Sequence, residues 1–146
     1  MIVKVKKLDG RAILPTYGSA CAAGADLYAL VDGESLTIAA GETVLVSTGL
    51  SVEIPEGYVG LIYARSGLAT KKGLAPANKV GVIDSDYRGE IKVALYNQSS
   101  IPQTISAGER IAQLVIAPYL SAVFEEADEL SDTLRGAGGF GSTGRK

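Results

Sequence analysis

The segment from Ala64 to Ala69, with the sequence ARSGLA, has the residue types of a phosphate site. It lies where an apolar strand ends and a short helix is expected to begin. Free backbone N–H groups and the positive end of a helix dipole make such a junction an anion site. Arg65 adds a fork of donors and Ser66 adds a hydroxyl. Phosphate binding is the natural interpretation, and an ordinary serine cap beside a surface arginine is the alternative.

A second segment, GVIDSDYRGE at residues 81–90, places carboxylates in a turn between two expected strands. Asp84 directly follows an apolar run, so its carboxylate could be held rigidly and act as a general base on water. Asp86 and Gly89 are residue types that are common in turns. A plain hairpin in which aspartate makes local hydrogen bonds explains the same pattern, and for this segment alone it is the simpler account.

Two more polar residues stand in apolar surroundings. Asp26, in AGADLYA at 23–29, could reach a metal-bound water or only satisfy neighbouring backbone. Gln113, in GERIAQL at 108–114, is the polar residue of interest where a turn leads into a buried strand. The spacing of these residues does not decide between functional and structural roles.

The residue types that are scarce narrow the chemistry further. The chain has 0 histidines and 1 cysteine, Cys21, so it cannot build the usual zinc sites or a Ser-His-Asp or Cys-His relay from its own residues. Hydrolytic chemistry would then rely on carboxylates and a hard, oxygen-ligated cation. The composition therefore favours Mg²⁺.

The C-terminal segment is rich in glycine, with RGAGGFGSTG at 135–144. It follows no expected strand and opens no expected helix, so it does not match a dinucleotide-binding fingerprint. A terminus without a role is one interpretation. The other is a lid over a nucleotide, because Arg135 offers a charge for phosphate, Phe140 offers a ring for stacking, and Ser142 and Thr143 offer hydroxyl donors.

Size and charge fit a small domain that binds a small ligand. A chain of 146 residues suits one domain, and its 14 basic and 16 acidic residues nearly cancel without a long basic run. A groove for long nucleic acid is therefore not indicated. A single cysteine agrees with a reducing compartment, which favours the cytoplasm. No apolar run approaches the ~20 residues of a membrane helix, so we expect no membrane partner.

Short strands are expected to position these residues. Apolar or alternating runs, separated by turn signals, recur at residues 2–8, 25–31, 43–47, 49–54, 58–64, 79–83, 90–96 and 109–117. This spacing predicts an all-β, jelly-roll-like domain. One short helix is expected from Ser66, whose hydroxyl can cap it, to Gly73. The β domain would span 1–124, followed by an acidic linker at 125–134 and the glycine-rich lid at 135–146.

In their order and spacing, these motifs closely resemble the five motifs of the trimeric dUTP diphosphatase (dUTPase) family over nearly the whole chain. The resemblance implies a jelly-roll subunit of the dUTPase-like or β-clip type and a homotrimer whose active sites take motifs from all three chains. It implies Mg²⁺-dependent hydrolysis of dUTP to dUMP and pyrophosphate by water attack on the α-phosphorus. Such an enzyme limits uracil incorporation into DNA and supplies dUMP for dTMP synthesis.

The resemblance also implies roles for individual residues. Asp84 would activate the attacking water, Tyr87 would pack against the deoxyribose so that a 2′-hydroxyl cannot fit, and Asp26 would steady a water on the magnesium. The uracil edge would be read by Asn78 with the hairpin backbone at Val80 and Gly81. The phosphates would be held by Arg65, Ser66, Gly67 and Gln113. The lid would contribute Arg135, Phe140, Gly141, Ser142 and Thr143. One departure from the family pattern is Lys79, where glycine is common.

Two other functions are alternatives to this one. A dCTP deaminase-like enzyme shares the fold, but that family places a catalytic glutamate where this chain has Ala94. A non-catalytic dUTP-binding module should have lost Asp84, Asp26 or the tail, and all three remain. The sequence therefore favours the diphosphatase.

Overall fold

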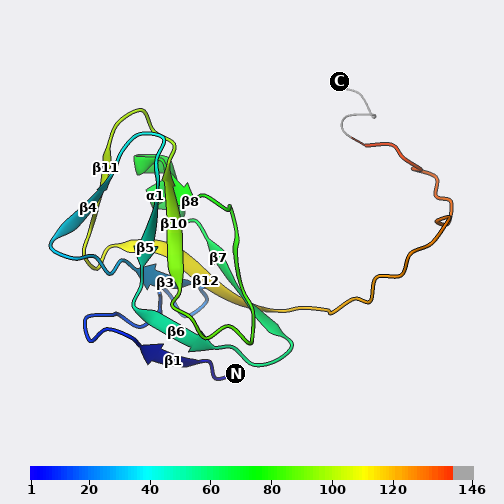
Figure 1. Ribbon diagram of the computed structural model, residues 1–146, viewed down its shortest axis with the longest axis horizontal. Helices are drawn as coiled ribbons and strands as arrows, with labels where there is room; N and C mark the ends of the chain where they lie inside the picture. Colours follow the sequence, from blue (N-terminus) through cyan, green and yellow to red (C-terminus); the bar gives the residue numbers. More distant parts are fainter. Residues whose placement is uncertain (140–146) are drawn as a thin grey trace.

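The computed structural model describes residues 1–139, which form twelve strands and one short helix, α1 (Ser66–Lys72) (Figure 1). The strands are β1 (Lys4–Lys7), β2 (Thr16–Tyr17), β3 (Ala25–Tyr28), β4 (Ser35–Ile38), β5 (Thr43–Ser47), β6 (Leu50–Glu53), β7 (Tyr58–Tyr63), β8 (Leu74–Pro76), β9 (Gly81–Ile83), β10 (Lys92–Asn97), β11 (Gln103–Ser106) and β12 (Arg110–Pro118). The prediction of an all-β domain with one short helix is confirmed.

The sheets are antiparallel and share one apolar core. The largest has the order β2-β3-β12-β7-β9, and a second has the order β5-β10-β8. Two-stranded sheets pair β1 with β6 and β11 with β4. Inward residues of both larger sheets belong to the same buried cluster, for example Leu27 and Ile62 from the first and Val93 and Leu95 from the second. The five-stranded sheet is the framework of the candidate site.

Four strands were not predicted from the sequence, namely β2, β4, β8 and β11. They have two to four residues each, and β8 ends at Pro76. Equally short strands, β1, β3, β6 and β9, were predicted only because they lie within longer apolar or alternating runs of the sequence. What forms the four unpredicted strands is tertiary pairing, as between Thr37 of β4 and Thr104 of β11. The predicted run at 79–83 is shorter than expected because the strand begins only at Gly81.

The helix has the predicted limits but not the predicted cap. Arg65 occupies the N-cap position with extended backbone, φ −87° and ψ 129°, and no side chain caps the helix. Ser66 is the first helical residue, so the expectation that its hydroxyl caps the helix was wrong. The end is as expected, because Gly73 takes φ 65° and donates its N–H to the carbonyls of Ala69 and Leu68. The hydroxyl of Ser66 is therefore not used by the helix terminus.

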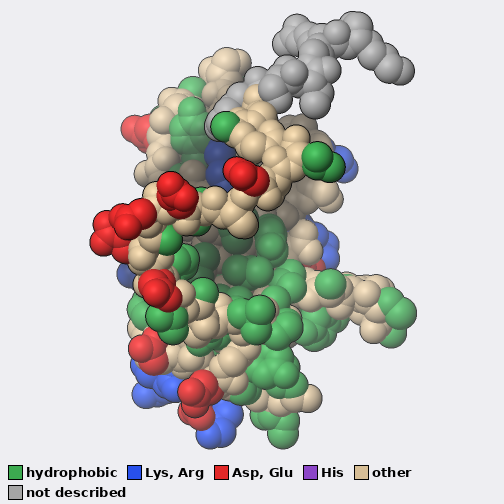
Figure 2. All heavy atoms as spheres, turned by 90° about the vertical axis from the view of Figure 1, so that its right-hand side faces the viewer, with side chains coloured by type: hydrophobic (Ala, Val, Ile, Leu, Met, Phe, Trp, Pro, Cys, Tyr) green, Lys and Arg blue, Asp and Glu red, His purple; other side chains and the backbone are tan. Residues whose placement is uncertain are grey.

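After β12 the chain leaves the body as a long arm without helix or strand (Figure 1). Leu120, Val123 and Phe124 on this arm are 95–96% exposed. Hydrophobic side chains also gather on the face of the body from which the arm leaves (Figure 2). Within residues 1–139 no helix combines the length and the apolar character needed for a membrane crossing. The division of the chain at residues 124 and 134 stays a prediction.

Candidate active site

Asp26 on β3 is the centre of a cluster of charges at one end of the five-stranded sheet. It is 8% exposed, and its Oδ1 accepts a hydrogen bond from Arg65 Nε at 2.8 Å. Its Oδ2 accepts a second hydrogen bond from Arg110 Nη1 at 3.1 Å. One carboxylate thus holds two guanidinium groups, one from the N-cap of α1 and one from the start of β12. The cluster keeps a net positive charge where phosphate binding was predicted.

Sequence analysis did not single out Arg110, and the reason is a bulge. The register between β12 and β3 shifts between Arg110 and Ala112. Gln113 pairs directly with Asp26, so the two side chains lie on the same face of the sheet. In a regular strand Arg110, three positions before Gln113, would lie on the opposite face. The bulge changes this alternation and lets Arg110 reach Asp26. An arginine just before a buried strand was the only sequence signal, and it carried no information about the bulge.

Gln113 joins the same cluster through close packing. Its Nε2 donates to the carbonyl of Ala64 at 3.0 Å, which fixes the chain directly before Arg65. A β-carbon at Gly24 would lie 2.7 Å from Gln113 Oε1, so glycine at position 24 leaves the space that the Gln113 side chain occupies. Ser66 and Gly67 are exposed at the start of α1, and Gly67 has open space around its α-carbon. The structure therefore brings together the four residues predicted to hold phosphates.

The other end of α1 is anchored as well. Lys72 Nζ donates to Glu109 Oε1 at 2.8 Å and to the carbonyl of Thr104 at 2.8 Å. Burial raises the pKa of Glu109, but hydrogen bonds from Lys72 and the Ser106 N–H, with the charges of Lys72 and Arg65, lower it further, so the net pKa lies below its usual value. Glu109 is therefore ionised at neutral pH, and α1 is tied to the sheet at both termini.

Asp84 and Tyr87 belong to a second cluster, in the β9–β10 loop, which connects the five-stranded sheet to the three-stranded one. Because β9 pairs with β7 while β10 pairs with β5 and β8, the two strands form no hairpin, and the expectation of a hairpin was wrong. The Tyr87 N–H donates to the Asp84 carbonyl at 3.1 Å, which closes the turn. A groove of ≈ 580 Å³ lies beside the β9–β10 loop, and its walls include Leu45, Val82, Asp84 and Tyr87. Leu45 and Val82 are each 61% exposed. This groove combines an apolar wall, an aromatic ring and a carboxylate.

The loop before β9 holds the residue predicted to read uracil. Asn78 is exposed, and its Nδ2 lies close to Gly81. The Val80 N–H donates to the Asn78 carbonyl at 2.7 Å around Lys79, whose φ is 65°. A positive φ is unusual for lysine, and glycine adopts it without strain. The backbone at Lys79 therefore has a conformation that suits glycine.

The two clusters lie at opposite ends of β7. In the pairing of β9 with β7, Ile83 lies opposite Gly60, so Asp84 follows beyond that point. Arg65 lies at the other end, five residues after Gly60 along β7. At the rise of an extended chain this separation is about 17 Å. One subunit therefore does not bring Asp84 next to its own phosphate cluster.

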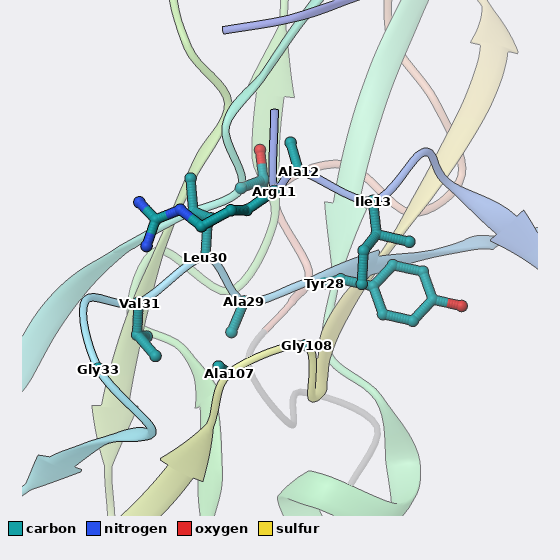
Figure 3. Close-up of a pocket in the computed structure, with 11 residues that line it drawn as sticks. Arg11, Ala12, Ile13, Tyr28, Ala29, Leu30, Val31, Gly33, Ala107 and Gly108 are labelled. Carbon is teal, nitrogen blue, oxygen red and sulfur yellow. The ribbon is translucent and has the colours of Figure 1, made fainter. Parts of the chain in front are cut away.

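A separate cavity of ≈ 120 Å³ lies near the turn before β12, between residues 11–13, 28–31 and 107–108 (Figure 3). Its walls include Ile13, Tyr28 and Ala29, and Arg11 at its edge pairs with Asp9 and Asp32. None of the residues predicted to act in the site lines it. The candidate site is therefore the pair of clusters at the ends of β7.

Residues 10–144 match the family model described as dUTPase. The chain belongs to the dUTPase family. It is 53% identical to the deoxyuridine 5′-triphosphate nucleotidohydrolase of Desulfitobacterium hafniense, with 97% of each chain covered. It is also 53% identical to the enzyme of that name from Hydrogenobaculum sp., with 100% of each covered. The family prediction made from the five motifs is confirmed.

Solved dUTPase structures have the same fold. The Staphylococcus bacteriophage 80alpha dUTPase with dUPNHPP aligns with a TM-score of 0.89 at 30% identity, over 99% of both chains. A point mutant of the dUTPase from phage phi11 of S. aureus, described as coordinating a structural Mg(II) ion, aligns with a TM-score of 0.78 at 26% identity, over 88% of this chain and 98% of that one. The predicted fold class is confirmed.

The predicted tail residues are only partly described. Arg135 lies on the arm, and its Nε donates to the Gly138 carbonyl at 2.7 Å. The predictions for Phe140, Gly141, Ser142 and Thr143 lie outside the described residues. Their roles stay predictions.

Replacing Asp26 with Asn should lower the stability of the protein by about 2 kcal/mol. The change leaves the guanidinium groups of Arg65 and Arg110 close together without a shared anion, and partial exposure of both reduces the cost below that of a fully buried pair. Thermal unfolding would measure the loss. Glu53→Gln is the matched control, because it removes the carboxylate of an exposed pair with Lys4 and should change unfolding little. Equal losses in the two variants would contradict this account of Asp26.

Proposed function

We propose that this protein is a Mg²⁺-dependent enzyme that hydrolyses dUTP to dUMP and pyrophosphate by attack of water on the α-phosphorus. The observation that carries the proposal is the Asp26-centred cluster, which orients Arg65 and Arg110 at the exposed start of α1. Membership of the dUTPase family and relatives named as deoxyuridine 5′-triphosphate nucleotidohydrolases support the same reaction. The enzyme would limit uracil incorporation into DNA and supply dUMP for dTMP synthesis.

The phosphate chain binds at the start of α1. Arg65 is held by Asp26 through its Nε and by the Arg110 carbonyl, 3.4 Å from its Nη1, so the orientation of its guanidinium group is fixed before substrate binds. Ser66 and Gly67 present a hydroxyl and backbone N–H groups, and Gln113 fixes the chain just before them. Donors held in place before the substrate arrives stabilise the charge that develops on the transferring phosphorus without further reorganisation.

The segments on either side of β9 provide recognition and the base. Asn78, with the backbone of Val80 and Gly81, reads the uracil edge, and the ring of Tyr87 packs against the deoxyribose and leaves no room for a 2′-hydroxyl. Asp84, at the edge of the same groove, orients the attacking water and accepts its proton. A general base on a rigid turn next to the sugar site is in position for an in-line attack on the α-phosphorus.

The Asp26 carboxylate is suited to hold a water bound to magnesium. Each carboxylate oxygen of Asp26 accepts one hydrogen bond from an arginine, and a carboxylate can accept about four in all. Asp26 therefore keeps acceptor capacity for a water bound to a cation that the substrate phosphates hold. Magnesium, when bound, neutralises phosphate charge and keeps the triphosphate in one conformation.

We further propose that the active enzyme is a homotrimer with active sites shared between subunits. In one chain Arg65 lies about 17 Å along β7 from Gly60 and Asp84 lies beyond Gly60, whereas both must act on one α-phosphorus. The exposed apolar groove wall at Leu45 and Val82 and the apolar residues of the arm are surfaces that a second copy would cover. The arm would carry Arg135, Phe140, Gly141, Ser142 and Thr143 to close a site. The single cysteine fits a cytoplasmic enzyme.

Product analysis tests the activity directly. The protein is incubated with Mg²⁺ and equimolar dUTP, dCTP, dTTP and UTP, and dUMP, pyrophosphate and ammonia are followed together. We expect dUMP and pyrophosphate from dUTP alone. Ammonia release would instead identify a dCTP deaminase-like enzyme, and tight dUTP binding without products would identify a non-catalytic module.

Replacing Asp84 with Asn should lower kcat by ~10²–10⁴-fold and leave nucleotide affinity nearly unchanged, because the amide cannot accept the proton of water. Asp86→Asn is the matched control, since it removes a carboxylate from the same turn and should leave kcat close to that of the unmodified protein. Steady-state pyrophosphate release measures both. An unchanged kcat in Asp84→Asn would remove Asp84 from the mechanism.

A further inference from the structure

Arg110, at the start of β12, keeps most of its guanidinium group free. Its Nη1 donates to Asp26 Oδ2 at 3.1 Å, and within the described part of the chain this is its only side-chain hydrogen bond. A guanidinium group carries five N–H donors, so most of them remain available to a ligand. The Arg110 side chain is 49% exposed, against 25% for Arg65. Of the two arginines in the cluster, Arg110 therefore offers the more accessible positive charge.

The acidic residue beside Arg110 in the sequence does not neutralise this charge. Glu109 Oε1 accepts a hydrogen bond from Lys72 Nζ at 2.8 Å, and its Oε2 accepts one from the Ser106 N–H at 2.9 Å. Both oxygens of Glu109 thus have partners on other elements. In residues 1–139 the one carboxylate bonded to Arg110 is that of Asp26, which also binds Arg65. A second anion between the two arginines would lower the repulsion that remains between them.

The contacts of Asp26 also place the two arginines side by side. Arg65 Nε and Arg110 Nη1 bind the two oxygens of the same carboxylate, and Arg65 Nη1 lies 3.4 Å from the Arg110 carbonyl. A triphosphate carries anionic oxygens along its whole length, so a chain held by Arg65 can extend to Arg110. The planar fork of N–H groups on arginine matches the geometry of phosphate oxygens.

We propose that Arg110 is a further substrate-binding residue, whose free N–H groups bind the pyrophosphate part of dUTP together with Arg65. This inference rests on the proposed function, in which Arg65 holds the phosphates. The β- and γ-phosphates carry most of the charge of a triphosphate, so a pair of arginines matches that part best. Negative charge builds up on the leaving pyrophosphate during attack on the α-phosphorus, and Arg110 stabilises it there.

The alternative is that Arg110 only neutralises Asp26. Its removal would then weaken phosphate binding indirectly, because the Asp26 carboxylate would repel the phosphates more strongly. The two roles differ when Asp26 is itself replaced by asparagine. A direct contact of Arg110 with phosphate still matters in that background, whereas a role in neutralising Asp26 does not.

The test measures how much the pyrophosphate part adds to binding, as the ratio of the Kd of dUMP to the Kd of a non-hydrolysable α,β-imido analogue of dUTP. Both are determined by calorimetry on the full-length protein with Mg²⁺. Arg110→Met, which keeps the length of the side chain, should lower this ratio about tenfold, because it removes hydrogen bonds to a charged group. The same fall is expected when Arg110→Met is added to Asp26→Asn. Arg110→Lys keeps a charge beside Asp26 but loses the fork, so its ratio should lie between the two.

Arg11→Met is the matched control. Arg11 is 58% exposed and pairs with the carboxylates of Asp9 and Asp32, away from the proposed site, so its replacement should leave the ratio unchanged. Three results would overturn the inference: an unchanged ratio in Arg110→Met, an equal fall in Arg11→Met, or a fall that disappears in the Asp26→Asn background.

Pyrophosphate release from dUTP is measured in parallel, so that failure of the inference can be told from failure of the proposed function. Absence of turnover together with the expected fall in the ratio would refute the proposed hydrolysis alone. Turnover together with an unchanged ratio in Arg110→Met would refute the role of Arg110 alone. An unmodified protein that binds the analogue no more tightly than dUMP would refute both.

Discussion

The length of β7 is the constraint on which the rest of the account depends. Its antiparallel pairing with β9 places Asp84 beyond Gly60, whereas Arg65 follows the opposite end of the strand. The same strand pairs with β12, which sets Gln113 opposite Tyr63 and so close to Arg65. The sheet thus places the proposed base and sugar contact toward one end and the proposed phosphate site at the other. Under the proposed mechanism, a second chain joins the two halves over one nucleotide.

At the phosphate end, the decisive interaction is the carboxylate of Asp26 shared by two arginines. Two guanidinium groups held close together repel each other, and one buried carboxylate between them lowers that repulsion while leaving a net positive charge. The exposed pair of Lys4 and Glu53 has a similar distance but little energetic consequence, because water screens it. The two kinds of ion pair have similar distances, so burial is what makes the Asp26 pairs contribute more to stability than the exposed pair.

Local chemistry explains what the sequence could predict and what it could not. Gly73 and the lysines before it correctly marked the end of α1. The strand–turn–strand pattern around Asp84 correctly indicated the two strands but not their partners, because β9 and β10 join different sheets and form no hairpin. The cap at Ser66 was wrong because tertiary contacts of Arg65 set the helix start. The bulge brings Arg110 to Asp26, which is 84 positions away in the sequence. The Gly49 N–H likewise donates to the Glu90 carboxylate, 41 positions away. No local sequence pattern contains contacts of this kind. The distance between the two clusters likewise depends on strand register, which spacing alone does not define.

The most direct test of a shared active site is activity in mixed assemblies of two inactive variants, Asp84→Asn and Arg65→Gln, refolded together. If each site takes its β9–β10 loop from one subunit and its phosphate cluster from another, random mixing leaves about a quarter of the sites with both parts intact. Mixing should then restore about a quarter of the activity of the unmodified protein. Mixed assemblies as inactive as either variant alone would show that each chain builds its own site, and would contradict the account.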